Sequence, residues 1–163
     1  MTKRTASFAL AAAVAVATLV SCNKDQTSKI SSGGVALTDE KVFTGTCTAF
    51  GIVTEEVPMY YVAEEDVYYL AYYYYGNGSF DFKWDKATGK LSVQECSTGL
   101  FYGFCAIDAL SQDEYEQTLG AEAKPSYYDP VSKTFTFNIL YQTADEAGDI
   151  LQIIDEVTYV VKE

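Results

Sequence analysis

The chain has 163 residues, with 23 acidic and 11 basic side chains and a formal net charge of −12. This acidity argues against nucleic acids and anionic lipid headgroups as partners, because both bind basic protein surfaces. The complete absence of histidine excludes Ser-His-Asp and Cys-His hydrolases and histidine-containing zinc sites, so we do not expect an enzyme.

The N-terminus has the order of features that is typical of a secretory signal. Lys3 and Arg4 precede an apolar run from Phe8 to Val20. This run is too short to span a bilayer, which needs about 20 residues. The string Leu19-Val20-Ser21-Cys22 resembles the lipobox of bacterial lipoproteins. The resemblance implies that residues 1–21 are removed as a signal peptide and that Cys22 is lipidated. An ordinary soluble secretory signal is the alternative, but it would not need Cys22.

The next segment predicts a tether followed by one domain. Residues 23–38 are polar and rich in glycine and serine, a composition typical of flexible linkers. We therefore expect residues 22–40 to connect the lipid to a single folded domain at 41–163, which is long enough for one hydrophobic core. Losing Lys3 and Arg4 with the signal changes the net charge from −12 to −14 and leaves no arginine. In the lipoprotein family, Asn23 is compatible with outer-membrane sorting and Asp25 favours surface display.

The domain shows the two-residue periodicity of β-strands. Apolar side chains alternate with polar ones over residues 79–84, 134–141 and 150–161. Turn sequences separate these runs, among them Gly76-Asn77-Gly78 and Asp85 to Lys90, the second typical of a type I turn with a glycine bulge. Short strands at this spacing predict an all-β fold, an antiparallel β-sandwich or barrel of about seven to nine strands.

Two segments depart from simple alternation. Residues 66–75 are apolar on both faces: Val67, Tyr69, Ala71 and Tyr73 would share one, and Tyr68, Leu70, Tyr72 and Tyr74 the other. Such a strand lies centrally or exposes one face for contact. Ser111 to Glu114 form a capping box, and Gly120 follows as a stop, which predicts one short helix covering a sheet edge.

Cysteine usage leaves two alternatives open. With Cys22 assigned to lipid, three cysteines remain, so at most one disulfide forms within the domain. Cys96 and Cys105 flank a probable hairpin and are the preferred pair. The three thiols could equally be small buried hydrophobic groups. Without a CxxC string, neither a redox motif nor a zinc motif is supported.

Two stretches resemble a recurring module of Bacteroidota-type cell-envelope lipoproteins. They are Phe80 to Lys90, which contains Trp84-Asp85, and Pro125 to Asn138, which contains Asp129-Pro130. The resemblance implies a small all-β domain of mostly uncharacterised function, and some neighbours in that group bind glycans at the cell surface. It implies no catalytic residue, and the Trp-Asp-x-x-Thr-Gly string is itself explained by turn geometry.

Tyrosines are the best candidates for ligand contact. Sugar rings stack their C–H faces on aromatic rings, and phenol hydroxyls bond to sugar hydroxyls. Tyrosine also packs well within a sheet, so each ring has a purely structural alternative, and Trp84 is expected in the core. Tyr60 and Tyr61 belong to the same aromatic group. The selected binding candidates are Tyr68, Tyr72, Tyr74, Tyr127 and Tyr128.

No cofactor or metal is expected. The acidic clusters Glu64-Glu65-Asp66 and Asp145-Glu146 with Asp149 do not match the spaced pattern of a calcium loop. The sequence therefore predicts a non-enzymatic lipoprotein of the outer membrane, anchored on its periplasmic or cell-surface face, that binds carbohydrate through a Tyr-rich sheet face. The alternative is a protein-interaction or structural component of the cell envelope, such as an adhesin or a complex subunit.

Overall fold

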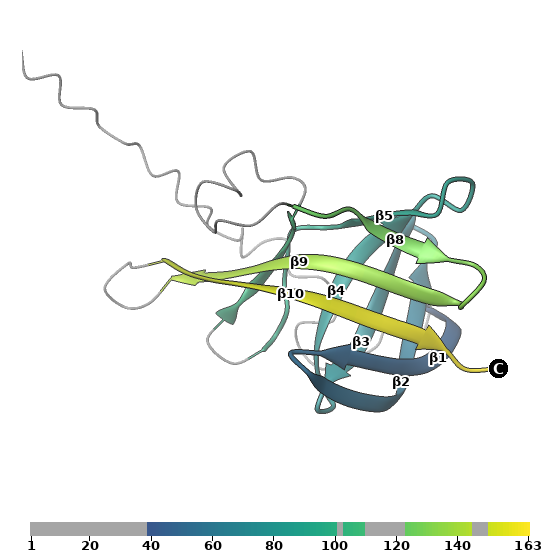
Figure 1. Ribbon diagram of the computed structural model, residues 1–163, viewed down its shortest axis with the longest axis horizontal. Coiled ribbons are helices and arrows are strands. Elements are labelled where there is room, and N and C mark those ends of the chain that lie inside the picture. The colour runs from purple at the N-terminus through teal and green to yellow at the C-terminus, as the bar shows by residue number, and fades with distance from the viewer. Residues whose placement is uncertain (1–38, 101–102, 110–122, 145–149) are drawn as a thin grey trace, which may run out of the picture.

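The computed structural model describes residues 39–100, 103–109, 123–144 and 150–163, which form ten antiparallel strands of one sheet (Figure 1). The all-β prediction is confirmed. The helix predicted at 111–120 lies outside the described residues, and none of the described residues forms a helix that could cross a membrane. The strands are β1 Glu40–Ala49, β2 Ile52–Val62, β3 Val67–Tyr74, β4 Asn77–Trp84, β5 Lys90–Val93, β6 Cys96–Ser97, β7 Cys105–Asp108, β8 Ser126–Asp129, β9 Thr134–Ala144 and β10 Ile150–Val161.

Eight of these strands close into a barrel. The order runs β10-β1-β2-β3-β4-β5-β8-β9, and β10 pairs with β9 to complete the ring. The free edge of β9 is shared, since β8 pairs with its Thr134–Thr136 half and β7 with its Ile139–Gln142 half. The β6–β7 hairpin thus covers the half of the β9 edge that β8 leaves unpaired. Closure leaves few unpaired strand edges, which would otherwise promote aggregation.

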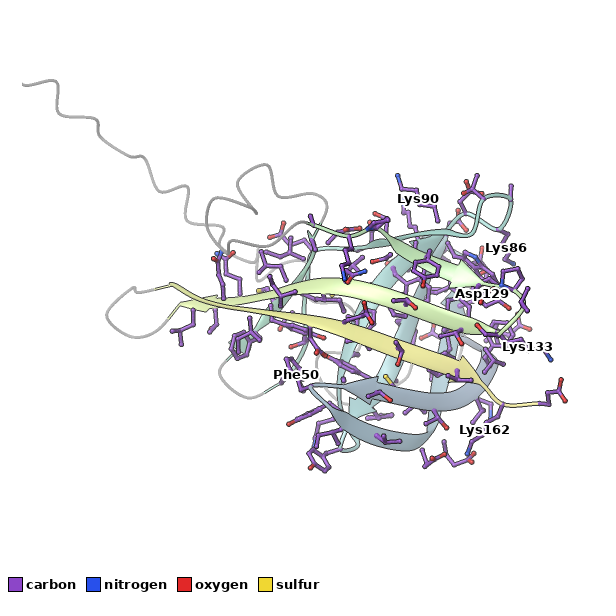
Figure 2. The ribbon with its side chains drawn as sticks, viewed as in Figure 1. Phe50, Lys86, Lys90, Asp129, Lys133 and Lys162 are labelled. Atoms are coloured by element: carbon purple, nitrogen blue, oxygen red, sulfur yellow. The ribbon has the colours of Figure 1, made fainter. Side chains whose placement is uncertain are left out.

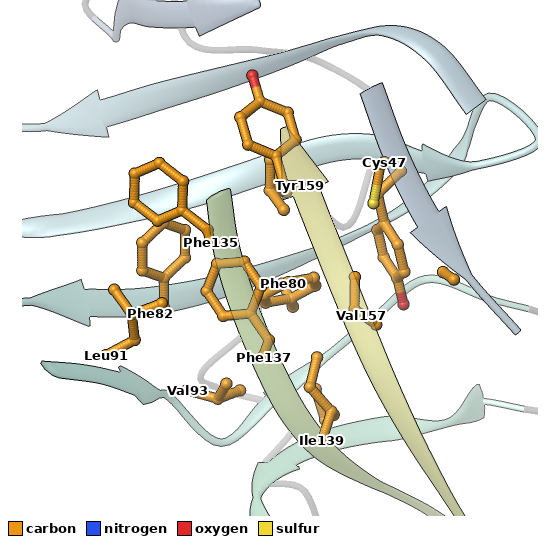
Figure 3. Close-up of a cluster of buried hydrophobic side chains, with 14 of the residues drawn as sticks. Cys47, Phe80, Phe82, Leu91, Val93, Phe135, Phe137, Ile139, Val157 and Tyr159 are labelled. Atoms are coloured by element: carbon orange, nitrogen blue, oxygen red, sulfur yellow. The ribbon is translucent and has the colours of Figure 1, made fainter. Parts of the chain in front are cut away.

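The barrel interior is an aromatic core. Phe80 and Phe82 from β4 meet Phe137 from β9, with ring centroids 5.0 and 4.7 Å apart (Figure 3). All three are fully buried, as are Val157 and Tyr159 from β10. On β4 the predicted alternation is confirmed, since Phe80 and Phe82 are buried and Lys83 is exposed. On β9 the expected polar face is buried as well: Thr136, Asn138 and Leu140 are 7%, 7% and 2% exposed.

The predicted faces of the Tyr-rich strand are wrong beyond Ala71. The register of β3 with β4 shifts between Ala71 and Tyr74, and Tyr72 has a φ of 60°. This bulge adds a residue and reverses the alternation, so Tyr73 joins Tyr68 and Leu70 in the core. Tyr68, Tyr72 and Tyr74 therefore do not form one continuous face.

The two ends of β10 have different environments. Leu151 and Ile153 keep the same strand phase as Val157 and Tyr159, as predicted, but they are 50% and 44% exposed. Figure 1 shows the reason, because the β9–β10 ribbon extends past the rest of the barrel. Two-residue periodicity sets which way a side chain points, whereas burial requires a neighbouring layer.

The predicted disulfide between Cys96 and Cys105 is wrong. Cys96 pairs with Ala106, and Ser97 pairs with Cys105 in the β6–β7 hairpin. Directly opposed residues share a face, so the Cys96 and Cys105 side chains point to opposite faces. Cys96 and Cys47 are free and buried, whereas Cys105 is disulfide-bonded and not to either of them. Burial, with a smaller contribution from nearby acids, raises the pKa of both free thiols to about 12.

Candidate functional site

A cleft of about 610 Å³ opens at one end of the barrel. Its lining comes from the start of β1, the end of β2, the start of β3, the end of β4 and the two turns that follow β2 and β4. Figure 2 shows Lys86 at this end, on the same side of the molecule as Asp129 and Lys133 and far from Phe50. The lining residues are Glu40, Val42, Tyr61, Asp66, Tyr68, Trp84, Asp85, Lys86 and Ala87.

The turn between β4 and β5 lies at the rim and is held by its own hydrogen bonds. The Asp85 carboxylate accepts hydrogen bonds from the Ala87 N–H at 2.9 Å and the Thr88 hydroxyl at 2.7 Å. These bonds, the Thr88 one first, lower the pKa of Asp85. The Gly89 N–H donates to the Asp85 carbonyl at 2.8 Å, and Gly89 has a φ of 77°. The predicted turn with a glycine bulge is thereby confirmed.

Three aromatic rings form the walls of the cleft. The rings of Tyr61 and Tyr68 lie 4.7 Å apart, and those of Tyr68 and Trp84 lie 5.6 Å apart in an edge-on arrangement. Behind Trp84, Tyr128 and Phe135 pack at 4.9 and 5.0 Å, so the indole is supported by the core. Trp84 therefore lies against the core as expected, and it also lines the cleft.

Polar groups flank these rings. The Tyr61 hydroxyl donates to Asp66 Oδ1 at 2.9 Å, which raises the pKa of Tyr61. Lys86 Nζ lies 5.4 Å from the centroid of the Trp84 ring and 5.7 Å from that of Tyr68. A hydrogen bond with Tyr68 is the largest cause of the raised pKa of Lys86. Counting Glu40, Asp66 and Asp85 against Lys86, the lining carries a net negative charge.

The carboxylates do not form a metal centre. Across the ranges that the structure describes, no three histidine, cysteine, aspartate or glutamate side chains lie together as metal ligands. Both oxygens of Asp85 are engaged by its own turn, and Asp66 accepts the Tyr61 hydroxyl. The lining is therefore suited to hydrogen bonding and ring stacking rather than to coordination of an ion.

The predicted tyrosines are divided among several places. Tyr68 lines the cleft, and Tyr128 supports it from behind Trp84. Tyr72 is 37% exposed outside the cleft, and Tyr127 is 50% exposed on the opposite side of β8 from Tyr128. Tyr74 packs edge-on against Phe50 with ring centroids 5.5 Å apart. The predicted sheet face is not assembled, whereas Tyr61 and Tyr68 do lie side by side.

Local sequence pattern does not group Asp66, Asp85 and Lys86 into one site. It places Asp66 in an acidic cluster and Asp85 in a hairpin turn. A usable signal was present, because alternate turns of a β-meander lie at the same end of the sheet. The turns after β2 and β4 satisfy that condition.

A scan against protein-family models, a search of curated proteins and a search of solved structures all find no match to this chain. A functional proposal therefore depends on the cleft and on the sequence features of the N-terminus.

Proposed function

We propose that this protein is an exported, lipid-anchored binding protein that holds a saccharide in the cleft at the barrel end. The observation that carries the proposal is the combination of the Tyr61, Tyr68 and Trp84 rings with three carboxylates in one opening. Aromatic rings offer flat apolar surfaces for the C–H faces of a sugar, and the carboxylates can accept hydrogen bonds from its hydroxyls. The ligand thus contacts the barrel mouth, in place of the sheet face that the sequence suggested.

The location follows from the N-terminal pattern. Basic residues, an apolar run and Leu19 to Cys22 occur in the order of a lipoprotein signal, and a polar tether follows. A multiply acylated cysteine would hold the protein stably at the membrane, since each buried methylene contributes about 0.8 kcal/mol. We assign the protein to the outer membrane, on its periplasmic or cell-surface face.

Glycan binding is expected to depend on Tyr61. Replacing Tyr61 with alanine removes one wall of the cleft and the hydroxyl that engages Asp66, so affinity should fall about tenfold or more, equivalent to about 1.4 kcal/mol. A glycan array with the domain from residue 39 onward identifies the ligand, and calorimetry measures its affinity for the wild type and the variant.

Tyr127→Ala is the matched control for this experiment. Tyr127 is the same residue type and is 50% exposed, but it lies outside the cleft. It should leave both affinity and melting temperature unchanged. Equal losses in the two variants, or binding that persists in Tyr61→Ala at unchanged melting temperature, would place the saccharide elsewhere. No binding to any glycan would contradict the proposed function.

Lipidation at Cys22 is expected to hold the chain at a membrane. Expressed with its own signal in a bacterium, the chain should appear in the membrane fraction, whereas Cys22→Ser should leave it soluble or unprocessed. Mass spectrometry of the mature protein detects the cleavage before Cys22 and the acyl chains on it. A processed but unlipidated wild type would indicate an ordinary secretory signal.

One observation favours protein binding as a second candidate function. Leu151 and Ile153 are large apolar side chains that remain about half exposed on the projecting β9–β10 ribbon. Exposed apolar side chains close together are typical of contact surfaces for other proteins. If no glycan binds, a variant with serine at both positions is the first to compare with the wild type in a search for envelope partners.

A further inference from the structure

We propose that the cleft selects a saccharide that bears a free amino group, and that the Lys86 ammonium is an internal occupant which this ligand displaces. The inference rests on the proposed function, because it names the chemical class of saccharide that the same cleft would hold. It is carried by the position of Lys86 between two aromatic rings and by the charge of the lining.

The Lys86 ammonium lies between two aromatic rings. Lys86 Nζ lies within 6 Å of the centroids of both Trp84 and Tyr68, which is the range of cation–π attraction. The rings are inclined at 68° to one another, so they form two sides of a corner around the charge. The cleft therefore already offers a site for an ammonium group, filled by a side chain of the protein itself.

Without Lys86, the charged residues that line the cleft would all be negative. Glu40, Asp66 and Asp85 line the same opening. With Lys86 turned out to solvent, these three carboxylates would have no cation among the lining residues. A positively charged ligand is attracted to such a cleft, whereas an anionic saccharide is repelled, the more so because the whole chain carries a charge of −12.

The Lys86 side chain is free to turn out of the cleft. The backbone of its turn is held by Asp85, Thr88 and Gly89, and none of those hydrogen bonds uses the Lys86 side chain. The lysine stem lies at the exposed tip of the turn and can rotate away while the turn keeps its shape. Displacement thus requires only a change of rotamer, together with loss of the contacts with Tyr68 and Trp84.

The experiment compares two saccharides that differ only in the amino group. Calorimetry at about pH 6, where a free amine is charged, measures the affinity of the glucosamine trisaccharide and of its fully N-acetylated form. We expect the amine form to bind at least about tenfold more tightly and to weaken with added salt, as contacts between charges do. Spermidine, a polyamine without a sugar ring, should bind more weakly than the amine trisaccharide.

Lys86→Ala supplies the decisive variant. Removing the internal competitor should tighten binding of the amine trisaccharide by roughly two- to fivefold, the size of an exposed cation–π contact, and leave the acetylated form unchanged. Lys90→Ala is the matched control, since Lys90 is exposed at the end of the same turn but outside the cleft lining, and it should change neither affinity.

Several results would overturn the inference. Equal affinities for the acetylated trisaccharide and the amine form are one such result. Weaker binding of both by Lys86→Ala is another, and it would make Lys86 a direct contact for a neutral ligand. In these cases the proposed function survives. Spermidine binding as tightly as the amine trisaccharide would remove the saccharide from the inference. Failure of every saccharide on the array would remove the proposed function as well.

Discussion

Replacing Phe137 with alanine is expected to lower the free energy of unfolding by about 3–5 kcal/mol, the usual cost of truncating a fully buried phenylalanine. Phe137 has no exposed surface and packs against Phe80 and Phe82 at centroid distances of 5.0 and 4.7 Å. Its removal leaves a cavity where β9 faces β4 across the barrel. Urea denaturation followed by circular dichroism measures the change.

Two further variants show whether the loss comes from the cavity. Phe137→Leu keeps most of the volume and should cost less than the alanine variant. Val131→Ala, at a position that is 92% exposed in the β8–β9 turn, should have almost no effect. A loss below about 1 kcal/mol for Phe137→Ala would mean that the aromatic core is less closely packed than the ring distances indicate.

Asp81→Asn is expected to stabilise the protein at neutral pH. Asp81 lies on β4 opposite Tyr69, and its Oδ1 is buried with no hydrogen-bond partner in the part of the chain that the structure describes. Burial, with a smaller contribution from Glu65, raises the pKa of Asp81 from 3.8 to about 6. The charged form is therefore disfavoured in the fold, and an amide at this position avoids the desolvation of a charge.

The sign of the pH dependence follows from linkage. Between about pH 4 and pH 6 the folded state holds the Asp81 proton and the unfolded state has lost it, so stability falls as pH rises through this window. The raised pKa corresponds to a loss of up to about 3 kcal/mol at pH 7. The wild type and Asp81→Asn should thus differ most at pH 7 and converge below about pH 4. Urea denaturation over this pH range measures both curves.

Asp129→Asn provides a control of opposite sign. Hydrogen bonds from Ser132 and from the Val131 N–H lower the pKa of Asp129, so its charge stabilises the fold above the ordinary pKa of aspartate. This variant should be less stable than the wild type at pH 7, and the difference should disappear as pH falls. Wild-type and Asp81→Asn curves that run parallel across the range would show that Asp81 is ionised in the fold with an ordinary pKa.

The all-β class and much of the core could be predicted from local pattern. Alternation at Phe80 and Phe82, and from Phe135 to Ile139, specifies strands whose aromatic side chains share one face, because successive side chains point to opposite sides. The turn at Asp85 to Lys90 was equally readable, since a glycine at positive φ and an aspartate that caps its own turn are short-range features. Such features depend on a few neighbouring residues, so they can be recognised from the sequence without the tertiary structure.

Register, closure and the site depend on contacts between distant residues. The bulge at Tyr72 reverses the faces of β3, and the pairing of Ser97 with Cys105 separates two cysteines that a hairpin alone would bring together. The cleft needs the ends of β2 and β4 at the same end of the barrel, on either side of β3, so that Asp66 and Lys86, 20 positions apart in the chain, line one opening. The sequence by itself determined which segments are strands and which residues prefer burial. Only the tertiary structure decided which tyrosines meet Trp84, because strand pairing sets those neighbours and local periodicity carries no information about them.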